Sequence, residues 1–486
     1  MAYMYSWEKP HAKGDLIMIR SYEAAVKILN DPKNFKVTWG DAIRFLTDRG
    51  DGKPQGANFC LSGDGEVNTK NRAVVRKALY DPKNWEKEVS DFYARTVRTL
   101  LKKYSHEIGA PKGGKVREVD IVRDVINMAN TRFNAALFCI PIKIEENPQG
   151  IFTEQELYLI CTAIFASIFF DADPAASLKV KELAHDFAGK VGEFASIVAN
   201  GVAVAGGVVE AIADLKELDG NPALSSFGNE LIGRLLEKGK SVEDCVWGTI
   251  MPLLSANVPN QSQVLAQCID YYLGDGAEHL PELYKLAHEN TPEADGKLMH
   301  YMLEGCRLRG TPAVYRDVEE DVVIEDYATA KPNATDYRSP NPVPIPDPAA
   351  TKIKIPVPKG RRIIVNLITA GRDATVFPEP DKVKLDRDIN SYIHYGWGPH
   401  RCAGMETSRI AQTALFKGIV GLKGLKRTKG LQGLVKSMPV RKWGGQMLAG
   451  QPDENSVVWT GLRMYMTGDQ SGYFPVPTTM KVVFDE

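Results

Sequence analysis

The sequence of 486 residues lacks the features that mark secreted and membrane-spanning proteins. Its cysteines form no CxxC pair and no regular framework, so we expect free thiols in a reducing compartment. They number seven and lie at positions 60, 139, 161, 245, 268, 306 and 402. The first fifteen residues, MAYMYSWEKPHAKGD, contain no long apolar core, which argues against a secretory signal or a membrane anchor. We therefore predict a cytoplasmic protein without a transmembrane anchor.

Long hydrophobic runs and an excess of either charge are also missing. The most apolar long run, 197–212, is interrupted by Asn200 and three glycines, and it is shorter than the roughly 20 residues that span a bilayer. The formal net charge of -1 gives no basis for binding nucleic acid or an anionic membrane surface. With 44% hydrophobic and 25% charged residues, the composition is that of an ordinary globular protein with an ample core.

Helical patterns dominate the chain, and short strand patterns follow them. Most of residues 85–310 shows the apolar spacing of helices. The tetrad from Thr153 to Glu156 is a capping box, and the tetrad from Ser241 to Asp244 is a similar start signal, so both predict that a helix begins there. Residues 331–359 are rich in proline, and short strands are predicted at 352–355 and 361–367. The fold class is therefore predicted to be mainly α with a small β region.

The segment that carries most information surrounds Cys402. Gly396 and Gly398 can adopt backbone angles closed to other residues, and they precede the cysteine in a short loop. Residues 405–425 contain no proline, so a helix is predicted to begin just behind the sulfur, and its positive end favours the thiolate. A thiolate presented in this way can be the axial ligand of a haem iron. A buried structural cysteine is the alternative, but the flanking pattern favours the metal ligand.

This segment resembles the haem-binding signature of cytochromes P450. The positions of that signature are filled by Tyr395, Gly396, Gly398, His400, Cys402 and Gly404. Tyr395 stands where phenylalanine is usual, and His400 takes the basic position that normally contacts a haem propionate. The resemblance implies a single large domain of cytochrome P450 fold over residues 1–486. It also implies haem b as the cofactor, with Cys402 as the axial ligand of the iron.

A second part of the resemblance precedes the cysteine loop. Glu304 and Arg307 lie three residues apart, so a helix would place them on one face as an ion pair. Such pairs are common on protein surfaces, but the order of this pair, then Pro312, then Arg316, is the order of the haem-thiolate family. The resemblance implies that Glu304 and Arg307 support the cysteine loop and that Arg316 contacts a propionate. Arg72 is a further candidate for such a contact, with Arg76 as its alternative.

The family completes this ion pair with a third basic residue, whose identity the sequence leaves open. In the corresponding stretch of this chain the candidates are Lys382 and, a few residues further on, Arg387. A lysine cannot reproduce the bidentate geometry of a guanidinium, so Lys382 is an imperfect replacement.

Residues 251–263 form the helical segment that is expected to cross over the haem. Relatives that activate dioxygen carry an acid–threonine pair there, and this chain has neither residue at the expected place. It has Asn257, Asn260, Gln261 and Gln263, with Pro259 among them. Amides do not shuttle protons near neutral pH, but they can donate a hydrogen bond to a peroxide oxygen. The other interpretation is a polar patch that lines water or caps a kink at Pro259.

A narrower resemblance covers nearly the whole chain from about residue 15. The stretches that carry it are SYEAAVKIL, WGDAIRF, VDIVRDVINMANTRF, ENPQGIFTEQELYLICTAIFASIFFDADPAAS, the NQSQ helix and SYIHYGWGPHRCAG. They look like the C-terminal haem-thiolate domain of fungal linoleate diol synthases, also called psi-factor-producing oxygenases. In that family a fused N-terminal dioxygenase domain makes a fatty-acid hydroperoxide, which the haem-thiolate domain isomerises. The catalytic amides of the family correspond to Asn260 and Gln263.

The dioxygenase half is absent from this sequence, so we expect either an excised domain or an enzyme supplied by a separate dioxygenase. The first hypothesis is a hydroperoxide isomerase that forms a diol or an epoxy alcohol from a lipid hydroperoxide without a reductase. The sequence does not choose between heterolysis and homolysis of the O–O bond. The alternatives are a monooxygenase that takes electrons from NADPH through a reductase and hydroxylates a fungal metabolite, and a non-catalytic haem-binding protein.

Several apolar residues are candidates to line a substrate channel. They are Phe165, Phe169 and Phe170 in one helical stretch, and Ala313 and Val314 ahead of Arg316. An aromatic cluster at helical spacing is more often plain core, so both interpretations stay open.

Overall fold

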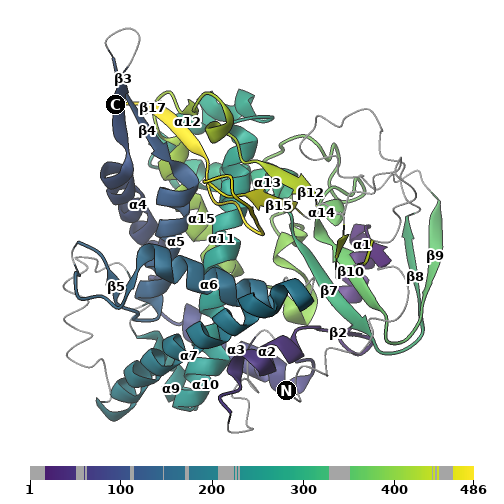
Figure 1. The fold of residues 1–486 in the computed structure, drawn as a ribbon. Coiled ribbons are helices and arrows are strands. Elements are labelled where there is room, and N and C mark those ends of the chain that lie inside the picture. The colour runs from purple at the N-terminus through teal and green to yellow at the C-terminus, as the bar shows by residue number, and fades with distance from the viewer. Residues whose placement is uncertain are drawn as a thin grey trace.

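The computed structural model describes most of the chain and shows a helical body with a strand-rich region beside it (Figure 1). The described residues are 17–50, 60, 63–109, 114–145, 147–169, 174–205, 224, 227, 230–327, 351–439, 442–443, 446–447 and 463–486. The N-terminal stretch 1–16, most of the proline-rich stretch, Phe170 and residues 206–212 lie outside them. Among the described residues, no helix is both long and apolar enough to cross a membrane.

Helices account for most of the described chain, as the sequence predicts. The α-helices are α1 (Tyr22–Leu29), α2 (Gly40–Thr47), α3 (Glu66–Tyr80), α4 (Trp85–Tyr104), α5 (Asn127–Leu137), α6 (Glu154–Phe169), α7 (Pro174–Ala205), α9 (Leu231–Glu237), α10 (Val242–Cys245), α11 (Met251–Tyr272), α12 (Leu280–His288), α13 (Pro292–Arg309), α14 (Leu367–Ala370) and α15 (Met405–Val420). Two π-helical segments, η2 (Ile121–Ile126) and η4 (Val246–Ile250), lead into α5 and α11. The 3-10 segments are η5 (Ala277–His279), η6 (Ile393–Tyr395), η7 (Gly398–His400) and η8 (Leu431–Gly433).

The predicted helix starts are confirmed by their capping hydrogen bonds. The Thr153 N–H donates to Glu156 Oε2 at 2.8 Å, and the Glu156 N–H donates to Thr153 Oγ1 at 3.2 Å, which is the reciprocal pattern of a capping box. Ser241 Oγ accepts from the Asp244 N–H at 3.0 Å and caps α10. These bonds satisfy amide groups that have no partner within the first turn of a helix, so a helix begins where the sequence supplies the acceptor.

The strands form small sheets, two of them four-stranded. Their bounds are β1 (Ile17–Ile19), β2 (Phe35–Lys36), β3 (His106–Gly109), β4 (Lys115–Asp120), β5 (Ile142–Lys143), β6 (Phe152–Thr153), β7 (Ala313–Val318), β8 (Val322–Tyr327), β9 (Lys352–Val357), β10 (Arg362–Asn366), β11 (Lys426–Arg427), β12 (Ser437–Pro439), β13 (Lys442–Trp443), β14 (Gln446–Met447), β15 (Arg463–Met466), β16 (Tyr473–Phe474) and β17 (Lys481–Asp485). One sheet has the order β1-β10-β7-β2, and the other has the order β11-β17-β4-β3. The predicted strands at 352–355 and 361–367 correspond to β9 and β10. In the first sheet Ile363 of β10 pairs with Arg316 of β7, which fixes the position of that arginine.

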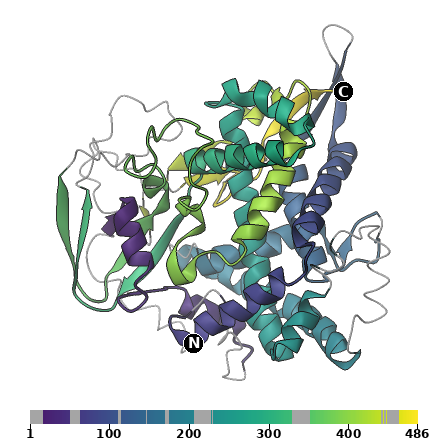
Figure 2. The same cartoon turned by 180° about the vertical axis from the view of Figure 1, so that it is seen from behind.

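The core lies where α11 meets its neighbours. This helix packs against α5, α6 and α13, and α15 packs against α4 and α13. Figure 2 shows α15, in yellow-green, passing through the middle of the helical body. Most side chains of α11 are buried around its whole circumference, which is why its sequence lacks a simple amphipathic stripe. Polar residues in such a helix need partners inside the protein, and the amides of α11 are therefore informative.

Candidate functional site

The loop that carries Cys402 is shaped by its two glycines. Gly396 and Gly398 have φ angles of +74° and +66°, which other residues rarely adopt. A Cβ on Gly398 would also lie 2.4 Å from the carbonyl oxygen of Leu29 in α1, so only glycine fits there. The Cys402 N–H donates to the carbonyl oxygen of Tyr395 at 2.9 Å and closes the loop. Helix α15 then begins at Met405, close behind the sulfur as the sequence predicts.

Helix α3 holds the main chain on both sides of Cys402. Arg72 donates to the carbonyl oxygens of Cys60, at 2.9 Å, and of Arg401. The Tyr80 hydroxyl donates to the carbonyl oxygen of Ala403 at 2.9 Å. These hydrogen bonds from α3 fix the orientation of the cysteine loop. In this structure the side chain of Arg72 is therefore occupied with main-chain carbonyls, and its predicted contact with a propionate stays a prediction.

The thiol of Cys402 has accessible surface although protein surrounds it. Burial raises the pKa of this thiol, while the Gly404 N–H and the charge of Arg72 lower it by smaller amounts. The helix end is predicted to favour the thiolate, but burial has the larger effect on the pKa of Cys402. Coordination to a metal deprotonates a thiol outright, so a bound iron, and not the helix alone, would create the thiolate.

Glu304 and Arg307 form a fully buried ion pair, not a surface pair. Arg307 donates to the two carboxylate oxygens of Glu304 at 2.8 and 2.7 Å, and their side chains are 1% and 0% exposed. Arg387 Nε reaches the same carboxylate at 3.2 Å. The amine of Lys382 instead pairs with Glu379 at the surface. The question left open by the sequence is thereby answered, because Arg387 and not Lys382 is the third member of the network.

Two further groups complete the shell of the Glu304 carboxylate. The Tyr392 hydroxyl donates to it at 2.9 Å, and the Lys384 N–H donates at 3.0 Å. Tyr392 lies just before η6, so the network connects α13 directly to the start of the cysteine loop. The hydrogen bonds and the charge of Arg307 outweigh burial and hold the pKa of Glu304 below its ordinary value. The side chain is therefore ionised at neutral pH and holds several donors in one place.

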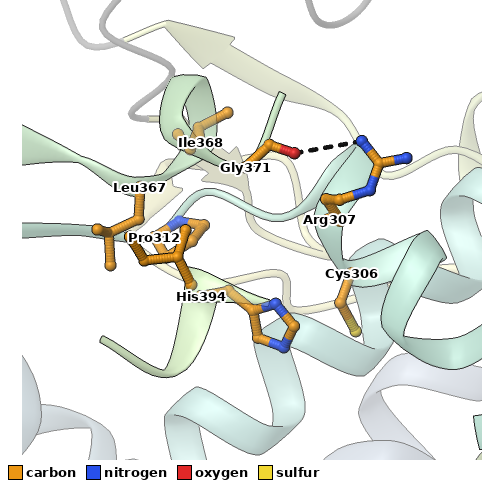
Figure 3. Close-up of a pocket in the computed structure, with 8 residues that line it drawn as sticks. Cys306, Arg307, Pro312, Leu367, Ile368, Gly371 and His394 are labelled. Carbon is orange, nitrogen blue, oxygen red and sulfur yellow. Dashed lines mark hydrogen bonds between the residues drawn. The ribbon is translucent and has the colours of Figure 1, made fainter. Parts of the chain in front are cut away.

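A small cavity lies between this network and the cysteine loop (Figure 3). It is lined by Cys306, Arg307, Pro312, Leu367, Ile368, Gly371, Ile393 and His394. The Nε2 atom of His394 is buried and has no hydrogen-bond partner among the described residues. Burial, helped by the nearby charges of Arg409 and Arg307, lowers the pKa of His394 to about 3, so the ring is neutral. Sequence reasoning missed this histidine, since nothing in the local pattern distinguishes it from other loop residues.

Arg316 is a buried cation with unused donors. It is 3% exposed, and its only hydrogen bond within the described chain is to the carbonyl oxygen of Tyr315, at 2.7 Å. No carboxylate of the described residues lies within ion-pair distance of it. Burial lowers the pKa of Arg316 to about 10, and the charge of Asp64 opposes this shift. A buried guanidinium in this state fits an anionic ligand such as the propionate that the sequence predicts.

His400 has a different neighbour from the one expected. Its Nε2 lies 2.8 Å from Oδ1 of Asp64, whose other oxygen accepts from the Val37 N–H at 3.0 Å. The sequence gives no signal for this pair, because its members are 336 residues apart. The contact of His400 with a propionate stays a prediction.

The amides of α11 fall on two adjacent faces of the helix. Asn260 Nδ2 donates to the carbonyl oxygen of Ala256 at 2.8 Å, and Gln263 Nε2 donates to Asn260 Oδ1 at 2.9 Å. Both side chains keep some exposed surface. Asn257 and Gln261 lie on the neighbouring face and bond to other helices. Asn260 and Gln263 thus lie on one face and are joined by a hydrogen bond, and α11 continues through Pro259 without interruption.

The predicted channel residues are mostly core. Phe165 is 5% exposed and packs on Phe169, with ring centroids 4.9 Å apart. Phe169 in turn meets the edge of Trp39 at 4.9 Å. Ala313 and Val314 are half-buried at the start of β7.

Comparisons of sequence and fold show which known proteins this chain resembles. The family model described as Cytochrome P450 matches residues 349–420. A linoleate diol synthase from Gaeumannomyces graminis is 39% identical over 98% of this chain and 44% of its own length. A psi-producing oxygenase A from Aspergillus fumigatus is 38% identical over 99% of the chain and 40% of its own length. A bifunctional dioxygenase–epoxy alcohol synthase from Fusarium oxysporum is 35% identical over 99% of the chain and 34% of its own length.

These curated relatives are longer proteins, and the chain spans less than half of their length. Solved structures show the same fold at low identity. CalO2 has a TM-score of 0.61 at 14% identity, covering 99% of this chain and 95% of its own. P450BioI, solved with an acyl carrier protein bearing hexadec-9Z-enoic acid, has a TM-score of 0.59 at 16% identity. The match covers 100% of this chain and 98% of the P450BioI chain. The predicted fold is therefore confirmed.

Proposed function

Because this chain belongs to the cytochrome P450 family, we propose that it is a haem-thiolate enzyme that rearranges a fatty-acid hydroperoxide to a diol or an epoxy alcohol without a reductase. The similarity to a linoleate diol synthase and to a dioxygenase–epoxy alcohol synthase supports this assignment. The observation that carries it is the Asn260–Gln263 pair on α11, in a helix whose residues 251–263 include no ionisable side chain.

The residues around Cys402 fit a haem b. Cys402 would hold the iron and Arg316 would bind a propionate, with His400 and Arg72 as further candidates for the haem edge. A thiolate-bound haem supplies electron density that promotes O–O cleavage. The N–H donors that Arg316 leaves unused within the described chain support this assignment most directly.

Asn260 is proposed to donate a hydrogen bond to an oxygen of the hydroperoxide. One hydrogen of its amide is used on the carbonyl oxygen of Ala256, which leaves the second available. Gln263 donates to the oxygen of the same amide, and such a bond strengthens the donor at the other end of the group. Gln263 thus holds Asn260 in place and polarises it. Neither amide can deliver a proton, which suits a substrate that arrives already oxidised.

The proposed substrate is a lipid hydroperoxide of the linoleate type, made by a dioxygenase activity outside this chain. The partly exposed rings of Phe169 and Trp39 offer an apolar surface for its hydrocarbon chain. We place the reaction in the cytoplasm, because all seven cysteines lie in the described chain as free thiols.

The test is an anaerobic incubation of the haem protein with a linoleic-acid hydroperoxide and no reductant. We expect turnover to a diol or an epoxy alcohol. Asn260→Leu should lower the rate by about 10²–10³-fold, the usual effect of removing a transition-state donor, while haem stays bound. Asn200→Leu is a matched control, because the Asn200 amide also donates to the carbonyl four residues earlier, at 2.8 Å, but on α7.

Two results would contradict the proposal. Activity that appears only with NADPH, a reductase and dioxygen would identify a monooxygenase. Equal turnover by the wild type and the Asn260→Leu variant would remove the amide from the mechanism.

A further inference from the structure

The face of α11 next to Asn260 carries a buried network of uncharged polar groups. Gln261 is its centre: its Oε1 accepts from Gln412 Nε2 at 2.8 Å and lies 3.2 Å from the Tyr93 hydroxyl, and its Nε2 donates to Asn257 Oδ1. Asn257 Nδ2 continues the network to Asn134 Oδ1 at 2.9 Å. The side chain of Gln261 therefore uses both ends of its amide within the protein.

This network joins three helices to α11. Tyr93 comes from α4 and also donates to Asn130 of α5 at 2.9 Å. Asn130 in turn donates to Ser262 at 3.2 Å. Gln412 comes from α15, the helix that begins three residues after Cys402. Gln261 is thus a direct link between the helix that carries the catalytic amides and the helix that follows the metal ligand.

The network fixes the positions of its groups and does not transfer protons. Among the described residues of the network, Tyr93 is the only titratable group, and burial raises its pKa well above 10. The other members are amides and one serine hydroxyl, which do not ionise. Buried polar groups that satisfy each other specify a unique arrangement, because any shift leaves donors or acceptors without partners. The Oε1 atom of Gln412 is the exception, since it is buried without a hydrogen-bond partner within the described chain. Such a network resists rotation of α11 about its own axis.

We propose that Gln261 is a positioning residue that fixes the rotation of α11 relative to α15, and thereby the place of Asn260 relative to the iron held by Cys402. The inference rests on the proposed function. On a helix with a Cα radius of about 2.3 Å, a rotation of about 20° moves each Cα by about 0.8 Å. A misplacement of about 1 Å can cost about 10²-fold in rate. Small rotations of α11 therefore matter for how the peroxide is held.

The test compares Gln261→Leu with Gln267→Leu. Gln267 is also a buried amide of α11, but it bonds to Thr311 at 3.0 Å and to Tyr465 at 2.5 Å and makes no hydrogen bond to α15 within the described chain. Both variants lose buried hydrogen bonds. Only Gln261→Leu should change the ratio of diol to epoxy alcohol and lower kcat at least tenfold. Both should keep the long-wavelength carbon monoxide band of the reduced haem. Gln412→Leu, which removes the link from the other side, should behave like Gln261→Leu.

Gln261→Glu gives a second measurement, the pH dependence of the product ratio. This dependence would be absent if Gln261 had only a structural role. A protonated carboxyl at this position can still accept from Gln412 and donate to Asn257, whereas the carboxylate has no donor. Burial raises the pKa of a carboxyl group, so the protonated form should persist toward neutral pH. We expect wild-type product ratios at low pH and altered ratios at high pH. The wild type should show no such transition, because its network does not ionise.

An unchanged product ratio in both Gln261→Leu and Gln412→Leu would overturn the inference, and so would equal changes in Gln267→Leu. Failure of the proposed function can be told apart from this result. If the wild type turns over no hydroperoxide, cyanide binding to the ferric haem still tests the position of Asn260. Its Kd should rise several-fold in Gln261→Leu and Asn260→Leu but not in Gln267→Leu, and equal Kd values in all four proteins would overturn the inference.

Discussion

Arg387→Met should destabilise the protein much more than Lys382→Met. The Arg387 side chain is 5% exposed and contacts the fully buried carboxylate of Glu304. It also donates to the carbonyl oxygens of Glu379, at 3.1 Å, and Lys382, at 3.2 Å. The Lys382 side chain is 71% exposed, and Glu379 is its one partner among the described residues. Both changes replace one cation with an uncharged side chain in the same segment, so the comparison isolates the buried network.

The expected magnitudes differ by several-fold. Removing one partner of a buried ion pair costs about 3–5 kcal/mol. Arg307, Tyr392 and the Lys384 N–H still satisfy Glu304, so we expect the lower end, about 3 kcal/mol, for Arg387→Met. An exposed pair such as Lys382–Glu379 is worth about 0–1 kcal/mol. Arg387→Lys should fall between these values, because an amine cannot reach several acceptors with a planar fork.

The assay is urea denaturation of the apoprotein, followed by tryptophan fluorescence, with the free energy of unfolding taken from the midpoint and slope. Haem retention in the holoprotein provides a second measurement, since the network leads to the start of the cysteine loop. Equal losses in the two methionine variants would refute the reasoning. A larger loss in Lys382→Met would show that lysine completes the network in solution.

Three other changes have clear expected outcomes. Arg316→Leu should lower haem affinity by about 10–100-fold, because a charged hydrogen bond contributes about 1.5–3 kcal/mol, yet it should not destabilise the apoprotein, since this buried cation has no anionic partner in the part of the chain that the structure describes; haem titration and apoprotein denaturation test both parts. Gly398→Ala should abolish the long-wavelength carbon monoxide band through the 2.4 Å contact with Leu29, whereas Gly296→Ala, whose Cβ meets nothing within 4 Å, should retain it. The lowered pKa of Glu304 contributes stability that is present above pH 4.5 and lost as the pH falls below it, so acid titration of Glu304→Gln should show a shallower decline there.

Features encoded by neighbouring residues were predictable from the sequence. The helix starts at Thr153 and Ser241 follow from acceptors placed three residues before a donor, and the structure has both bonds. The bend before Cys402 follows from two glycines, and both have positive φ angles. The ion pair of Glu304 and Arg307 needs only a helix between them. In each case the interacting groups lie within a turn or a short loop.

Features that depend on long-range packing were not predictable. Arg387 meets Glu304 across 83 residues, and spacing alone could not prefer it over Lys382. Asp64 and His400 meet only because the segment before α3 lies beside the cysteine loop. Gln412 of α15 reaches Gln261 across 151 residues, and a glutamine inside an otherwise regular helix carries no local signal of a partner. Such contacts are decided by how helices are rotated and stacked, which a single sequence does not specify.

The lack of ionisable side chains in residues 251–263 of α11 matters for the proposed reaction. A dioxygen-activating site must deliver protons, so it needs ionisable groups in contact with the oxygen. Residues 251–263 have none, and the polar groups that back them are amides, Ser262 and Tyr93, whose phenol keeps its proton at all physiological pH values. A site whose ionisable groups are replaced by amides cannot deliver protons to dioxygen. It can still process a hydroperoxide, because this substrate carries its own proton. Asn260→Asp should therefore impair peroxide turnover, because a carboxylate repels a peroxide oxygen and cannot donate to it.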